Sequence, residues 1–115
     1  MDNFVRQYFI TALWSSTDGN EDHLDENYDL EDLADETIAA GIEDCNKFRK
    51  DNAELIEDDD ETDIAHDFWL TRNGHGVGFW DRNHSQEKSD ALCKSCDEFG
   101  ECWLFVGDDG KVYFM

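Results

Sequence analysis

The first half of the chain carries apolar residues at helical spacing. Those of the first segment are Phe4, Val5, Tyr8, Phe9, Ala12 and Leu13. Because side chains three and four apart share one face of a helix, this spacing predicts an amphipathic helix over residues 3–14. The aromatic and β-branched content of the segment leaves a strand as the alternative.

A second apolar stripe follows a polar loop that we predict over residues 15–27. Its members are Leu30, Leu33, Ala34, Ile38, Ile42, Cys45 and Phe48, and the pattern extends to Leu55 and Ile56. It predicts a helix that Asp29 caps at the N-terminus, since an aspartate side chain accepts hydrogen bonds from free backbone N–H groups there. Gly41 is a point at which this helix could divide in two. The acidic run over residues 57–63 is too highly charged to hold a helix alone and predicts a solvated connector.

Short aromatic runs replace the helical pattern in the second half. Two pairs of such runs flank turn-forming sequences, and each pair predicts a β-hairpin. The first hairpin pairs residues 68–71 with 77–80, and the second pairs 103–106 with 111–114. A short helix is predicted between the two hairpins, over residues 87–99. We therefore expect an α+β domain with two to three helices packed on one face of a roughly four-stranded antiparallel sheet.

Charge separates the chain into the same two halves. The 115 residues suit a single domain, and an apolar content of 39% is enough to build a core. Residues 1–64 hold 21 acidic and 4 basic side chains, a net charge of −17, whereas residues 65–115 hold 9 and 5, a net charge of −4. This polarity predicts an acidic helical part that faces a basic partner, carried by a hairpin-helix-hairpin part. Nucleic acid and anionic membranes are poor direct partners because their phosphates would be repelled.

The expected compartment determines the expected state of the four cysteines. No apolar run approaches the roughly 18–20 residues that span a bilayer, and the N-terminal sequence lacks the basic start of a signal peptide. We therefore expect a cytoplasmic protein with reduced thiols. Cys93, Cys96 and Cys102, with Cys45 or His84 as a fourth ligand, have the chemistry of a zinc site. A single CxxC pair is weak support for zinc, so we expect unligated thiols.

One acidic segment imitates the ligand spacing of an EF-hand loop. Its candidate ligands are Asp18, Asn20, Asp22, Glu26 and Asp29. The position that requires glycine holds His23 instead, and no helix is predicted directly before the loop. The sequence therefore predicts neither calcium nor any other cofactor.

The segment His66–Arg82, which reads HDFWLTRNGHGVGFWDR, resembles a segment of small, mostly uncharacterised proteins encoded by tailed bacteriophages. The likeness extends in the same order to Ala12–Thr17, Leu24–Tyr28, Asp44-Cys45 with Phe48, and Gly107–Gly110. It implies a phage protein that acts in the cytoplasm of an infected bacterium, and the family brings no established activity. The chain departs from the family in its cysteines at positions 93, 96 and 102.

Seven carboxylates form the first candidate site. They are Asp25, Asp29, Asp32, Asp35, Glu36, Glu43 and Asp44. On a helix, opposite the apolar stripe, such residues form rows that imitate duplex phosphates. Because phosphate contacts to Lys and Arg dominate duplex binding, the array can block a nucleic-acid channel. The leading hypothesis is a non-catalytic DNA mimic that inhibits a basic host DNA-binding protein, such as a restriction, CRISPR or recombination enzyme. A merely solvated face, or adaptation to a salty cytoplasm, is the alternative.

Polar groups around the first predicted hairpin form the second candidate site. They are His66, Asp67, Arg72, Asn73, His75, Asp81 and Arg82. Acid–base and anion-binding groups beside aromatic walls can build an active or ligand-binding site. The preferred interpretation is structural, with Asn73 and Gly74 in the turn and the two aspartates paired with the two arginines. A small enzyme or ligand-binding module centred here is the second hypothesis, and a virion accessory protein is the third.

Overall fold

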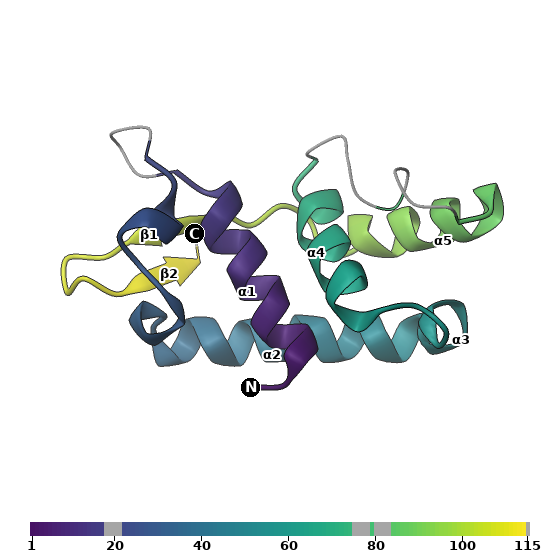
Figure 1. Ribbon diagram of the computed structural model, residues 1–115, viewed down its shortest axis with the longest axis horizontal. Helices are drawn as coiled ribbons and strands as arrows, with labels where there is room; N and C mark the ends of the chain where they lie inside the picture. Colours follow the sequence, from purple (N-terminus) through teal and green to yellow (C-terminus); the bar gives the residue numbers. More distant parts are fainter. Residues whose placement is uncertain (18–21, 75–78, 80–83, 115) are drawn as a thin grey trace.

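The computed structural model shows a mainly helical protein with one small sheet at one end (Figure 1). It describes residues 1–17, 22–74, 79 and 84–114. The α-helices of these residues are α1 (Asn3–Ser15), α2 (Asp35–Asp51), α3 (Ala53–Ile56), α4 (Glu61–Arg72) and α5 (Gln86–Asp97). The remaining elements are the 3₁₀ turns η1 (Leu24–Glu26) and η2 (Leu30–Asp32) and the antiparallel strands β1 (Leu104–Val106) and β2 (Val112–Phe114).

The predicted α+β fold with a four-stranded sheet is wrong, because the first strand of the first predicted hairpin lies in a helix. Residues 68–71 lie in α4, and the second strand predicted there, 77–80, lies outside the described residues except for Phe79. Residues 67–70 are all buried, so α4 is covered on every side over a full turn. A helix enclosed in this way has no polar face and therefore no helical period in its sequence.

The acidic run before α4 starts that helix and is not only a connector. Asp60 is its N-cap, and the carboxylate accepts hydrogen bonds from the backbone N–H groups of Thr62 at 2.8 Å and Asp63 at 3.3 Å. Glu61 and Asp63 then occupy the first turn, where negative charge interacts favourably with the helix dipole. The prediction of a solvated connector over residues 57–63 is therefore wrong for its second half, which contains the N-cap and the first turn of α4.

Other predicted elements are confirmed, with one helix start displaced. The helices α1 and α5 and the C-terminal hairpin occupy nearly the predicted residues. Asp29 caps a helical turn as predicted, but the turn is η2, where Asp29 and Asp32 form a reciprocal capping box. The long helix α2 begins only at Asp35, passes through Gly41 without interruption and ends before Asn52.

Aromatic rings form the centre of the core. The helices α1 and α4 have the most extensive contact of any pair of elements, and α2 runs across one end of both (Figure 1). The ring of Phe68 lies 4.2 Å from that of Phe48 and 5.3 Å from that of Tyr8, measured between centroids. Tyr8 also meets Trp69 edge to face at 5.2 Å. These contacts join α1, α2 and α4 through one aromatic cluster.

The hairpin is attached to the start of α2. The carbonyl oxygen of Val112 accepts hydrogen bonds from the backbone N–H of Ala34 at 3.1 Å and from the Thr37 hydroxyl at 2.9 Å. In the register of the hairpin Leu104 faces Phe114, and Val106 faces Val112. The beginning of α2 and the strand β2 therefore form one structural unit at this end of the molecule.

Within the part of the chain that the structure describes, no helix is long and apolar enough to cross a membrane.

Gly41 provides the first test of the packing. A Cβ atom added at this position would overlap the ring of Phe9, so the absence of a side chain lets α1 and α2 approach closely. In an isolated helix Gly41→Ala would stabilise by about 1 kcal/mol. Here we expect it to lower the free energy of unfolding by about 1–3 kcal/mol through overpacking, measured by urea denaturation. In the control, adding Phe9→Leu to Gly41→Ala should cost less than the sum of the two single changes. Unchanged or increased stability of Gly41→Ala would refute the close approach.

Candidate functional site

Arg72, from the second candidate site, has a structural role. Its side chain is only 4% exposed. The Nε atom donates to the carbonyl of Gly100 at 2.9 Å, and Nη2 donates to the carbonyl of Phe99 at 3.0 Å. Nη1 donates to the Tyr8 hydroxyl at 2.9 Å and to the Asp44 carboxylate at 2.8 Å. These bonds engage all three nitrogens, so the guanidinium group holds elements together and is not presented to a ligand.

The ion pair that Arg72 forms changes the interpretation of both candidate sites. The sequence predicts that Arg72 pairs within its own hairpin, with Asp67 or Asp81, but it forms an ion pair with Asp44 of α2. Asp44 itself was expected on the acidic binding face. Its side chain is 35% exposed and compensates a buried positive charge, so Asp44 belongs to the scaffold.

The other described members of the second candidate site do not come together around a ligand. Asn73 follows α4, donates to the carbonyl of Trp69 at 3.0 Å and accepts from the backbone N–H of Cys102 at 2.8 Å. His66 lies half-buried between α1 and α4, with Nδ1 2.8 Å from the Thr11 hydroxyl oxygen. His66 and Arg72 are six positions apart on α4, which places the two side chains on different faces of the helix. Asp67 is buried in α4, whereas residues 75, 81 and 82 lie outside the described residues.

The cysteines do not assemble a metal centre in the described part of the chain. No three His, Cys, Asp or Glu residues there form a group that could hold a metal ion. Burial raises the pKa of the Cys45 and Cys96 thiols far above its ordinary value. The pKa of Cys102 is also raised by burial, although the nearby charge of Arg72 opposes the shift. Two of the residues proposed for calcium, 18 and 20, lie outside the described residues.

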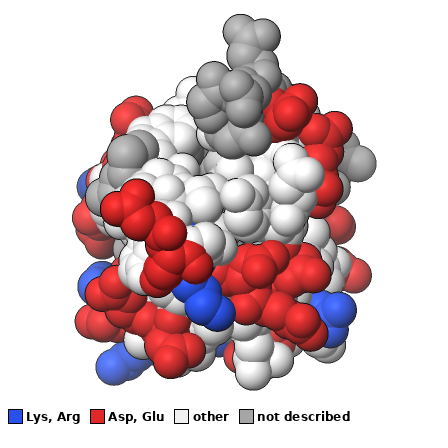
Figure 2. All heavy atoms as spheres, turned by 90° about the vertical axis from the view of Figure 1, so that its left-hand side faces the viewer, with Lys and Arg blue, Asp and Glu red and all other residues white. Residues whose placement is uncertain are grey.

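Most of the first candidate site gathers at one end of the molecule. We call this surface the acidic end and define it by seven carboxylates of η1, η2 and the first turn of α2. They are Asp25, Glu26, Asp29, Glu31, Asp32, Asp35 and Glu36. Figure 2 shows the face that contains these elements and the hairpin, where acidic side chains outnumber basic ones.

The carboxylates of the acidic end are exposed, and the Lys and Arg residues that the structure describes do not pair with them. Among the seven side chains only that of Asp32 is half-buried. None of the seven makes an ion pair with a Lys or Arg that the structure describes. The sequence explains why, since residues 7–46 contain no Lys or Arg. This gap in basic residues is a signal that could have located the acidic end from the sequence.

Two of the acidic residues near the other end of α2 form ion pairs with lysines. Asp51 pairs with Lys47 at 2.8 Å, and Asp59 pairs with Lys88 at 2.5 Å. The two acidic regions are separated by the 17 residues of α2, a length of about 25 Å at 1.5 Å per residue. Acidity therefore occurs at both ends of the protein, and the end that includes η1 and η2 is the less neutralised.

The predicted rows of carboxylates along one helix are wrong. Asp25, Asp29 and Asp32 precede α2 and lie in or beside the 3₁₀ turns, because Leu33 and Ala34 are extended and pair with β2. Glu43 is exposed about two turns further along α2 than Glu36. The acidic end is thus built from three consecutive short elements and not from one helix face.

No protein-family model, curated protein or solved structure matches the chain. The functional interpretation therefore depends on the charge and geometry of the molecule.

The Arg72 contacts predict a large loss of stability when the guanidinium group is removed. Arg72→Met should lower the free energy of unfolding by about 3 kcal/mol, because it leaves the part-buried acceptors of Phe99, Gly100 and Asp44 without their donor. The matched control is Arg49→Met, which removes an ion pair to the exposed Asp2 and should cost only about 1 kcal/mol. Urea denaturation of both variants measures the difference, and similar losses would show that Arg72 does not hold the fold together.

Thiol reactivity tests the burial of the cysteines. Cys93 is partly exposed, whereas Cys45 and Cys96 are buried with a raised pKa. Since the thiolate is the reactive species, iodoacetamide at pH 8 should modify Cys93 first and reach the two buried thiols only after unfolding in urea. Peptide mass spectrometry over time gives the order of modification. Early modification of Cys45 or Cys96 in the native protein would contradict this arrangement.

Proposed function

We propose that the protein is a non-catalytic inhibitor that binds the nucleic-acid-binding surface of a basic partner protein through its acidic end. The observation that supports this most directly is the set of seven carboxylates without a Lys or Arg ion pair among the described residues. Concentrated like charges repel one another and cost folding stability. A cationic partner relieves that repulsion, so binding is favoured by the same charges that oppose folding.

The density of charge supports mimicry of a duplex. The net charge is −21 and the longest dimension of the molecule is 43 Å. This is one negative charge per about 2 Å, close to the value of about 1.7 Å for double-stranded DNA. A protein surface that binds duplex through Lys and Arg contacts to phosphate would therefore meet a comparable charge density on this chain.

The carboxylates are held by ordered structure. The side chain of Asp32 accepts from the backbone N–H of Asp29 at 2.9 Å, and Asp29 accepts from that of Glu31 at 2.9 Å. The first turn of α2, which carries Asp35 and Glu36, is joined to β2 by the bonds to Val112. A preorganised array loses less conformational entropy on binding than a flexible acidic tail, which favours affinity.

The alternative of an enzyme or ligand-binding module lacks support from the described residues. Arg72 and Asn73 are engaged in structural bonds, and His66 lies on another face of α4.

The resemblance to tailed-phage proteins suggests the kind of partner and the place in which the protein acts. The partner is then a host defence or DNA-processing protein in the bacterial cytoplasm, such as a restriction, CRISPR or recombination enzyme.

Two variants with the same change in charge test the proposal. The first neutralises the acidic end by Asp25→Asn, Glu31→Gln, Asp35→Asn and Glu36→Gln. The matched control neutralises the opposite region by Glu54→Gln, Glu57→Gln, Asp58→Asn and Glu61→Gln. All eight side chains are exposed. Each set includes two residues from the first turn of an α-helix, Asp35 and Glu36 of α2 in the first and Glu54 of α3 and Glu61 of α4 in the control.

The immobilised protein should capture basic DNA-binding proteins from a bacterial lysate at low salt, and duplex DNA should displace them. We expect the acidic-end variant to retain at least about tenfold less of these proteins, because charge complementarity is lost, and the control to retain nearly as much as the wild type. Captured amounts are quantified by mass spectrometry. Equal losses in the two variants, or capture that duplex DNA does not displace, would overturn the proposal.

A further inference from the structure

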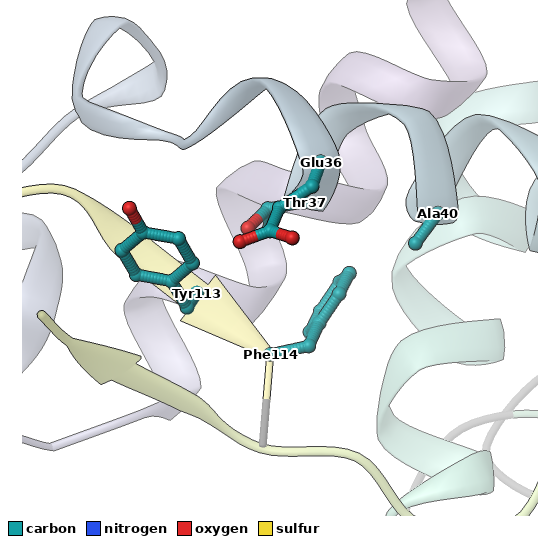
Figure 3. Close-up of a pocket in the computed structure, with 5 residues that line it drawn as sticks. All are labelled: Glu36, Thr37, Ala40, Tyr113 and Phe114. Atoms are coloured by element: carbon teal, nitrogen blue, oxygen red, sulfur yellow. The ribbon is translucent and has the colours of Figure 1, made fainter.

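A small pocket lies beside the acidic end, between α2 and β2. It has a volume of about 220 Å³ and is lined by Glu36, Thr37, Ala40, Tyr113 and Phe114. Figure 3 shows the Glu36 side chain reaching from α2 so that its carboxylate lies between the rings of Tyr113 and Phe114. The pocket volume is smaller than the roughly 300–1,000 Å³ of a typical small-molecule site, so the pocket suits a single side chain.

The inner wall of the pocket is fixed by the core. The ring of Phe114 stacks on that of Phe9 at 5.9 Å and on Trp69 at 6.2 Å, and both of these residues are fully buried. The Thr37 hydroxyl donates to the carbonyl of Val112 at 2.9 Å. The residues of the inner wall are therefore anchored in the core.

The outer wall is also held in place. The Tyr113 hydroxyl donates to Asp109 at 2.6 Å, and its ring stacks on Phe105 at 5.8 Å. The hydrogen bond to Asp109 raises the pKa of Tyr113, and the charge of Glu36 contributes in the same direction. The Glu36 carboxylate therefore lies close enough to act on the tyrosine electrostatically.

These groups match the chemistry of a guanidinium ion. Glu36 makes no ion pair with a described Lys or Arg, so its negative charge is available to a ligand. A guanidinium group is planar, stacks on aromatic rings and donates two parallel hydrogen bonds to a carboxylate. A lysine ammonium is compact and strongly hydrated, and it cannot form both contacts equally well.

We propose that this pocket binds one arginine side chain of the partner protein, between the rings of Tyr113 and Phe114 and against the Glu36 carboxylate. The inference rests on the proposed function and adds a specific anchor to it. Long-range attraction by the acidic end brings a basic surface close, and the pocket then selects arginine over lysine at one position. Arginine is enriched among the residues that contribute most to binding at protein interfaces.

The test uses the whole protein and two fluorescent peptides of equal length and charge, one with six arginines and one with six lysines. Affinity is measured by fluorescence anisotropy at fixed ionic strength. We expect the wild type to bind the arginine peptide at least about fivefold more tightly than the lysine peptide. Glu36→Gln should weaken binding of the arginine peptide at least about fivefold and remove the preference.

Two further variants separate the pocket from general electrostatics. Glu31→Gln makes the same change in charge on η2, and it should weaken both peptides less than about twofold and keep the preference for arginine. Tyr113→Leu keeps the charge but removes one aromatic wall, so it should reduce the preference. Thermal unfolding confirms that each variant is folded.

Equal effects of Glu36→Gln and Glu31→Gln, together with equal binding of the two peptides, would overturn the arginine pocket and leave the proposed function standing. If neither peptide binds the wild type, the arginine pocket is overturned. If charge neutralisation at the acidic end also leaves capture of basic proteins unchanged, the proposed function fails with it.

Discussion

A buried guanidinium group needs compensation from every side, and in this protein that need connects the elements of the fold. Transferring the charge of Arg72 from water into the interior costs several kcal/mol unless hydrogen bonds and an opposite charge replace the lost hydration. The replacements come from Tyr8 on α1, Asp44 on α2 and the carbonyls of Phe99 and Gly100 between α5 and β1. One side chain of α4 thus fixes the positions of three other parts of the chain, in a protein with only 9 Lys and Arg residues.

The position of the acidic end depends on this arrangement. Asp44 lies in the middle of α2, so its bond to Arg72 holds that helix across α1 and α4. Nearer its start, α2 is joined to the hairpin through Thr37 and Val112. Two attachments along one helix define its direction, and the carboxylates before and within its first turn are presented on a fixed support. The same attachment to the hairpin places Glu36 beside Tyr113.

The sequence allows prediction of the elements that have one buried and one exposed face. The apolar stripe of α1 and the turn at residues 107–110 led to correct elements, because the signal in each case is local. Enclosure of α4 on all sides removes its periodicity, which is why Phe68–Thr71 resembles a strand in the sequence.

The candidate site was predictable only in part. The concentration of acid in the first half is a property of composition, but it covers both acidic regions and does not separate the acidic end from the region at the other end of α2. The bond between Asp44 and Arg72 and the pocket formed by Glu36 and Tyr113 join residues far apart in the sequence, so no local pattern indicates them. For this reason the sequence alone places Asp44 on the binding face and Tyr113 in neither candidate site.

The most direct test of the acidic end as a binding surface is amide hydrogen exchange of the protein, alone and in complex with a captured basic partner. We expect slower exchange on binding over residues 22–38 and in β2, and little change over residues 53–62 at the other end of α2. Protection confined to α4 and α5, or an unchanged rate across the acidic end in a stable complex, would contradict this expectation.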